Sequence, residues 1–177
     1  FGGVPVPITL QAGRNFHATG DGIDRRGSPR TAGALFASPA NPTGTVLDDA
    51  VLAGNAGRLR EKGGQLILDE IYHGLSYERD VPTALQHGDD VFVVQSFSKY
   101  FNMTGWRLGW LVVPERFTRQ IEVLAQNLYL SPSSPAQYAA LAAFRPETLE
   151  ILESRRAEFR RRRDFLAPAL ESLGFRL

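Results

Sequence analysis

The sequence predicts an α/β fold: a mostly parallel sheet with helices on both faces. Short apolar runs at 33–39, 65–72 and 91–96 have the length of buried strands. A helical pattern at 47–62 lies between the first two, and Gly63-Gly64 follows as its stop signal. Strands that alternate with helices usually lie parallel in one sheet between two helical layers.

The region before residue 33 has weaker signals. Residues 4–10 alternate like a strand, and the two prolines there restrict such a strand to a sheet edge. Residues 11–32 are polar and rich in Gly and Arg, which indicates loop or weak helix. The four residues NPTG at 41–44 have the composition of a turn.

Further elements follow the third strand. We expect a strand at 106–113 and an amphipathic helix at 115–128. Another helix should begin with Ser134 as its cap, Pro135 in its first turn and Gln137 reaching back.

A last long helix is predicted from about Pro146 to Leu173, with a kink at Pro168. Its apolar residues recur every seven positions: Leu152, Phe159, Leu166 and Leu173. The arginine-rich stretch 155–165 within it has interleaved acidic residues and no aromatic platform, so we interpret it as a solvated helix face.

Composition excludes several classes of protein. The 177 residues carry a net charge of +1, which gives no electrostatic reason to expect a nucleic-acid or membrane partner. There is no cysteine, and the three histidines are scattered without metal-ligand spacing. No apolar run approaches the length of a membrane span.

Polar side chains follow each of the three predicted parallel strands. Asn41 follows the first, Asp69 ends the second, and Ser96, Ser98 and Lys99 follow the third. Ligands in open α/β sheets bind beyond the carboxyl ends of parallel strands, so these groups should face one crevice. An ammonium group at the end of a buried strand costs several kcal/mol, which favours a chemical role for the lysine.

This set of groups suits pyridoxal 5'-phosphate (PLP). The cofactor needs an amine for a Schiff base, and a carboxylate against its pyridine nitrogen, for which Lys99 and Asp69 are the candidates. Its phosphate needs a cation and hydroxyl groups, and its ring oxygen needs hydrogen-bond donors. The candidates for these roles are Arg107 with Ser96, and Tyr72 with Asn41.

Three ordered motifs, NPTG, LDEIY and SFSKYFNMTGWRLG, resemble the signatures of the class I/II aminotransferases, the aspartate-aminotransferase-like fold-type I PLP enzymes. The lysine motif of that family is matched at six positions: Ser96, Ser98, Lys99, Gly105, Arg107 and Gly109. The resemblance implies that Lys99 is the catalytic lysine and proton shuttle, and that PLP is the cofactor. It also implies amino acid and 2-oxo acid substrates, a homodimer and a cytoplasmic location.

By the same resemblance, residues 1–145 are the C-terminal part of a large PLP-binding domain, and 146–177 are a long helix entering a small domain. The phosphate-cradling turn, the ring that stacks on the cofactor and the substrate-carboxylate arginine of this family have no counterpart here. We therefore expect a fragment that is inactive by itself.

Alternatives stay open at this point. The same motifs occur in C–S lyases and related PLP enzymes of this fold, and in PLP-binding sensor domains of transcription regulators. Lys99 by itself could be a surface lysine, and Asp69 could be only a turn cap. We interpret Glu70 as structural and His73 as a residue without catalytic duty.

Overall fold

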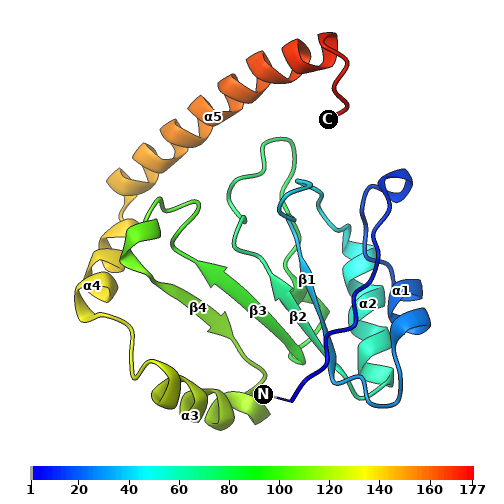
Figure 1. Ribbon diagram of the computed structural model, residues 1–177. Coiled ribbons are helices and arrows are strands. Elements are labelled where there is room, and N and C mark those ends of the chain that lie inside the picture. The colour runs from blue at the N-terminus through cyan, green and yellow to red at the C-terminus, as the bar shows by residue number, and fades with distance from the viewer. Residues whose placement is uncertain (1) are drawn as a thin grey trace.

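A four-stranded sheet forms the centre of the computed structural model, which describes residues 2–177 (Figure 1). Its strands are β1 (Gly33–Ala37), β2 (Gln65–Asp69), β3 (Val91–Ser96) and β4 (Gly109–Val112), in the order β1-β2-β3-β4. The first three are parallel, and β4 is antiparallel to β3. The mostly parallel sheet predicted from the sequence is confirmed.

These residues also form five α-helices: α1 (Gly20–Arg26), α2 (Asp49–Glu61), α3 (Thr118–Leu128), α4 (Ser134–Ala143) and α5 (Pro146–Ser172). The short 3-10 helices are η1 (Ala12–Arg14), η2 (Ala84–His87), η3 (Thr104–Trp106) and η4 (Glu115–Phe117). Figure 1 shows α1 and α2 on one side of the sheet, and α5 extending away beyond α4.

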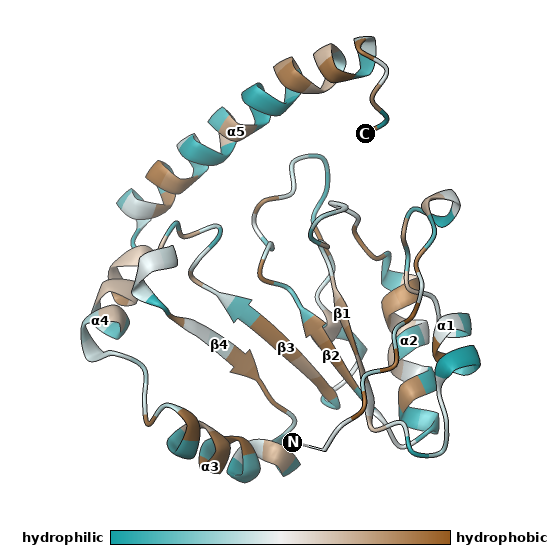
Figure 2. Ribbon diagram, viewed as in Figure 1, coloured by the Kyte–Doolittle hydropathy of each residue, from teal (hydrophilic) through white to brown (hydrophobic). Residues whose placement is uncertain are grey.

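The two faces of the sheet are covered unequally. Alternate residues of β2 and β3, such as Leu68 and Val93, are buried against Leu52 and Leu59 of α2. Residues of opposite parity face the other way, and Leu35 of β1 is 68% exposed there. Figure 2 shows apolar colour along β2 and β3 and on turns of α2. The expected helical cover is therefore present on one face and incomplete on the other within residues 2–177.

The predicted strand at 4–10 is wrong. These residues form no regular element, although Ile8 packs on the edge of the core. Pro5 and Pro7 have no amide hydrogen for a strand ladder, which explains why the alternation is not enough. The predicted strand at 106–113 is shortened to β4, because η3 and the left-handed Arg107 occupy its start.

The C-terminal helices differ in detail from expectation. Ser133 is the cap residue of α4 in place of Ser134, and Gln137 donates to the carbonyl of Pro132 at 3.0 Å. The longer α5 continues past Pro168 without interruption and ends at Ser172. Of its heptad residues only Leu152 is buried. No helix within residues 2–177 has the length and apolar character that a membrane crossing requires.

Candidate active site

The carboxyl ends of β1, β2 and β3 lie along one edge of the sheet. Asp69 at the end of β2 is in register with Ala37 of β1 and Val94 of β3. Backbone bonds continue just past this point, since Ser38 N–H donates to the Asp69 carbonyl at 3.0 Å. The segments that carry the candidate residues therefore leave the sheet side by side, as the sequence predicts.

Three of the candidate residues contact one another there. The Asn41 amide donates from Nδ2 to the Tyr72 hydroxyl at 3.2 Å. Lys99 Nζ lies over the Tyr72 ring, 5.3 Å from its centroid. The lysine is half-buried, and its Nζ makes no hydrogen bond or ion pair with any side chain or carbonyl that the structure describes. The structure thus holds a partly desolvated amine against a phenol.

The serines and Arg107 form a second chain of contacts. Ser96 Oγ accepts the Ser98 N–H at 3.0 Å, and the Ser98 carbonyl accepts from Thr104 Oγ1 at 2.7 Å. Arg107 then donates from Nη1 to the Thr104 carbonyl at 2.9 Å. No bond joins Arg107 directly to either serine, but the Thr104 bridge holds them on one turn.

Arg107 has an unusual backbone conformation. Its φ of 53° lies in the left-handed region, which costs a non-glycine residue about 1 kcal/mol or more. The residue sits between η3 and β4, where Gly109 pairs with Ser96 at the same sheet edge. In this turn the exposed guanidinium bonds back to the Thr104 carbonyl.

Asp69 is half-buried at the end of β2. Its Oδ1 accepts the N–H of Ile71 at 3.0 Å, so it does cap the turn that follows the strand. Its Oδ2 has no hydrogen-bond donor among the described residues. One carboxylate oxygen is thus used for local structure, and the other remains available to a ligand.

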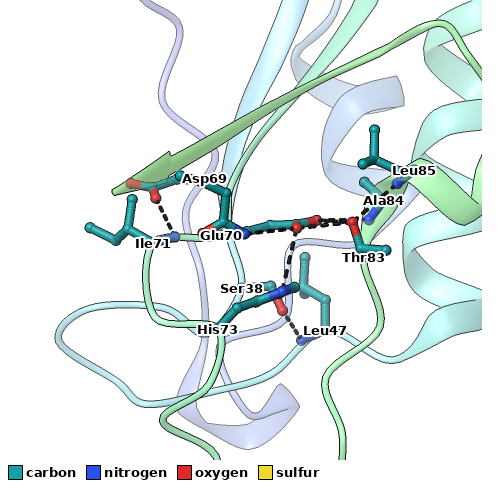
Figure 3. A network of polar contacts seen from close by, with 10 residues as sticks. Ser38, Leu47, Asp69, Glu70, Ile71, His73, Thr83, Ala84 and Leu85 are labelled. Atoms are coloured by element: carbon teal, nitrogen blue, oxygen red, sulfur yellow. Dashed lines mark hydrogen bonds and ion pairs between the residues drawn. The ribbon is translucent and has the colours of Figure 1, made fainter. Parts of the chain in front are cut away.

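Glu70 points to the opposite side and is structural, as the sequence analysis holds (Figure 3). Its side chain is 1% exposed. The carboxylate accepts from Thr83 Oγ1 at 2.9 and 3.0 Å and from the Ala84 N–H at 2.7 Å. His73 Nδ1 lies 3.4 Å from the same carboxylate. This network ties the end of β2 to the start of η2.

An aromatic cluster packs around the segment that carries Lys99. Phe97 is buried, and its ring lies 4.9 Å from Phe101, 5.1 Å from Trp110 and 5.7 Å from Phe144, measured between centroids. Because Phe97 and Phe101 flank Lys99 in the sequence, this cluster fixes the backbone on both sides of the lysine.

Sequence reasoning missed one set of polar contacts, between the lysine segment and α5. The Tyr100 hydroxyl donates to Glu153 Oε1 at 2.6 Å, and Arg156 donates to Glu153 Oε2 at 2.9 Å. Partial burial and the bond to Glu153 raise the pKa of Tyr100 to about 12. The same bond, with help from Arg156, lowers the pKa of Glu153.

Two arginines of α5 contact the rest of the protein, although the sequence predicted a solvated face for this stretch. Arg156 donates to the Ser76 carbonyl, and Arg163 pairs with Glu78 at 2.6 Å. Both guanidiniums also lie over the Tyr77 ring, at 5.7 and 4.8 Å from its centroid. The interpretation as a solvated face is therefore incomplete for these two arginines, which also dock α5 on the loop after β2. No local sequence signal pairs residues so far apart.

Comparison with known proteins agrees with this geometry. The family description "Aminotransferase class I and II" matches residues 1–177. The chain belongs to this family of aminotransferases.

Individual relatives carry related names. A valine–pyruvate aminotransferase of Mycobacterium tuberculosis is 41% identical over 82% of this chain. A probable aspartate/prephenate aminotransferase of Aquifex aeolicus is 32% identical over 98%. The chain spans 38% and 45% of these two relatives, which is less than half of each.

Solved structures show the same arrangement. An aminotransferase from Mycobacterium tuberculosis superposes with a TM-score of 0.87 at 38% identity, over 93% of this chain and 43% of that one. A mutant aspartate aminotransferase from Thermus thermophilus gives 0.92 at 31% identity, over 99% and 49%. The fold of this chain is thus that of the matching part of these enzymes.

Proposed function

We propose that this chain carries the lysine half of a PLP-dependent aminotransferase site, which moves an amino group between an amino acid and a 2-oxo acid. The observation that carries the proposal is the half-buried Lys99 amine, bonded to no described anion, at the edge shared with Asp69 and Tyr72. When bound, PLP supplies an electron-withdrawing ring that stabilises negative charge at the substrate α-carbon. The family membership supports the same reading.

Tyr72 and Asn41 suit the ring oxygen of the cofactor. Because Asn41 Nδ2 donates to the Tyr72 oxygen, the phenolic proton is left free to donate elsewhere. A negatively charged oxygen is the strongest acceptor for such a proton. The pair would therefore hold the cofactor ring by a charge-assisted hydrogen bond.

Asp69 suits a protonated ring nitrogen. Its Oδ1 is fixed by the Ile71 N–H, which orients the carboxylate without neutralising it. Its Oδ2 would accept the N–H of a pyridinium, and the negative charge would keep that nitrogen protonated.

The Thr104 bridge prepares a phosphate site. Arg107 uses Nη1 for the Thr104 carbonyl, which leaves the rest of its guanidinium fork for an anion. Ser96 uses its oxygen as an acceptor from Ser98 N–H, so its hydroxyl proton is free to donate. The Ser98 hydroxyl has no partner in the described part of the chain and adds a second donor.

Lys99 would anchor the cofactor and then move a proton at the substrate α-carbon. The aromatic cluster of Phe97 and Phe101 fixes the backbone on both sides, so only the side chain needs to swing. The Tyr72 ring lies 5.3 Å from Nζ, and the half-buried lysine is partly shielded from water. These features suit a group that acts as both attachment point and base.

The wider assignments rest on the family resemblance. We assign residues 146–177 to the entry of a small domain, the working enzyme to the cytoplasm, and its assembly to a homodimer. Exposed apolar side chains at the end of α3, such as Leu128 and Leu130, give a surface that an assembly would cover. A fully active monomer in sedimentation would contradict the dimer.

A half-reaction assay on the full natural protein tests the function. Loaded with PLP and given single amino acids, it should convert the cofactor from its pyridoxal to its pyridoxamine form and release the matching 2-oxo acid. A 2-oxo acid should then reverse the change. Release of a sulfur leaving group or carbon dioxide instead, or no conversion with any of the amino acids, would overturn the aminotransferase assignment.

A further inference from the structure

Tyr100 joins three segments that are distant in the sequence. Its ring packs on the backbone of Gly74, where a Cβ would lie 2.8 Å from Tyr100 Cδ2. Its neighbour Lys99 reaches over Tyr72, and its own hydroxyl donates to Glu153 of α5 at 2.6 Å. One side chain thus contacts the loop that carries Tyr72, the segment that carries Lys99, and α5.

Gly74 makes this packing possible. Its φ of +86° lies in the left-handed region that glycine adopts without strain. Any side chain at position 74 would meet the Tyr100 ring, so the loop and the ring are closely matched. Phe101 packs edge-on against the same ring at 5.2 Å between centroids.

Arg156 completes the connection on the α5 side. It donates to Glu153 Oε2 at 2.9 Å and also to the Ser76 carbonyl, two residues beyond Gly74. Glu153 is therefore held by a phenol from one segment and a guanidinium that is itself bound to the other. Charge-assisted bonds of this kind are shorter and stronger than neutral ones.

We propose that Tyr100 is a positioning residue: through Glu153 and Arg156 it couples the placement of α5 to the placement of Lys99. The proposal rests on the proposed function for the role of Lys99, but the coupling itself is a property of this chain. A shift of α5 would pull on the hydroxyl of Tyr100, and the adjacent backbone would carry that pull to the lysine. Loss of the hydroxyl would free the lysine segment from α5.

The sequence offers an internal standard for a test. Lys62 and Lys99 are its two lysines. Lys62 lies at the end of α2 and pairs with Asp24 at 3.3 Å, away from this site. The full natural protein, freed of cofactor, is labelled with a small amount of an amine-reactive reagent. Mass spectrometry then gives the ratio of the labelling of Lys99 to that of Lys62. This ratio needs no catalytic activity.

Tyr100→Phe removes the hydroxyl and keeps the ring on Gly74. We expect the Lys99/Lys62 ratio to rise about fivefold, the change that losing one net hydrogen bond makes in a local opening equilibrium. Glu153→Leu should match it, and Tyr100→Phe combined with Glu153→Leu should add little. Glu153→Gln keeps an acceptor for the phenol and should have a smaller effect.

Tyr138→Phe and Glu150→Gln are the matched controls, since both residues are exposed and neither belongs to this contact chain. They should leave the ratio unchanged. An unchanged ratio in both Tyr100→Phe and Glu153→Leu, with folding verified by thermal unfolding, would overturn the coupling. If Tyr100→Phe fails to fold, Glu153→Leu and Glu153→Gln give the same comparison from the α5 side.

The two proposals fail separately. A raised ratio in a protein that shows no amino transfer would leave the coupling intact and remove the assigned reaction. An active enzyme in which Tyr100→Phe and Glu153→Leu leave the Lys99 reactivity unchanged would support the assigned reaction and remove the coupling.

Discussion

The Asn41 amide donates to the Tyr72 hydroxyl at 3.2 Å, and Lys99 Nζ lies 5.3 Å above the ring of the same tyrosine. Residues from three successive connections of the sheet thus meet at one phenol. Because the Tyr72 oxygen accepts this hydrogen bond, its own proton stays free and can be donated to an anionic oxygen.

Tyr72→Phe should weaken PLP binding roughly tenfold, because one charge-assisted hydrogen bond is lost while the ring under Lys99 stays. Titration of the apo-protein with PLP, followed by absorbance, measures the change. Tyr138→Phe is the control, since Tyr138 is exposed on α4. An unchanged affinity in Tyr72→Phe would show that its hydroxyl does not face the cofactor.

Lys99→Ala should lose the absorbance of lysine-bound cofactor and lower turnover by a factor on the order of 10⁴ or more. In the proposed site the amine is both the attachment point and the base, and Lys62, the other lysine of this sequence, lies away from it at the end of α2. Lys62→Ala is the control and should behave as the parent protein. Persistence of the lysine-bound spectrum in Lys99→Ala would place the attachment elsewhere.

Asp69→Asn should lower the rate by about a hundredfold or more while changing cofactor affinity much less. An asparagine side chain still accepts the Ile71 N–H, so the turn is kept, but the negative charge against the ring nitrogen is lost. Separate measurement of turnover and of PLP affinity distinguishes the two effects. Near-normal turnover would reduce Asp69 to a turn cap.

Glu70→Ala should destabilise the fold by about 3 kcal/mol, because the Ala84 N–H and the Thr83 hydroxyl lose a buried charged acceptor. Denaturant unfolding measures the loss. Glu150→Ala removes an exposed carboxylate and should change the free energy of unfolding by less than about 0.5 kcal/mol. Equal stability of the two variants would contradict the structural role of Glu70.

The hydroxyl of Tyr100 should titrate late. Its pKa is raised from 10.0 to about 12 in the folded protein, so its contribution to stability is complete below about pH 10 and is lost as the pH rises toward 12. The groups around it are Glu153 and Arg156 of α5, with Arg79 and Asp80 from the loop.

An absorbance titration of tyrosinate checks this pH dependence. Tyr100→Phe should remove the component of the curve at highest pH, and Tyr138→Phe should leave that component in place. Loss of a component near pH 10 in Tyr100→Phe would contradict the raised pKa.

The sheet could be predicted because its signals are local. The apolar residues of the run at 65–72 lead into the acid Asp69, and the structure ends β2 at that acid. The direction of β4 could not be predicted in the same way, since it depends on how the turn around Arg107 reverses the chain. The strand expected at 4–10 does not form, because two prolines there lack the amide hydrogen that a sheet hydrogen bond needs. Alternation of apolar residues alone is therefore not enough to predict a strand.

The candidate site was predictable where residues follow strand ends, and not where they meet across long loops. The parallel register places Asp69, and Asn41 and Lys99 follow a few residues after the ends of β1 and β3. The contact of Tyr100 with Glu153 bridges 53 positions and depends on the path of α5. Nothing in the sequence around Tyr100 or Glu153 indicates that they form a pair. Arg156 could not be distinguished from the other arginines of the same stretch.

Asp69 and Glu70 are adjacent acids on opposite faces of one strand end, and this has a consequence for strand alignment. A slip of β2 by one residue would turn every side chain to the other face. It would carry the Asp69 carboxylate into the interior, and it would break the bonds that Glu70 makes with Thr83 and Ala84. The buried bonds of Glu70 thus help to fix the alignment of β2, and with it the side of the sheet to which Asp69 projects.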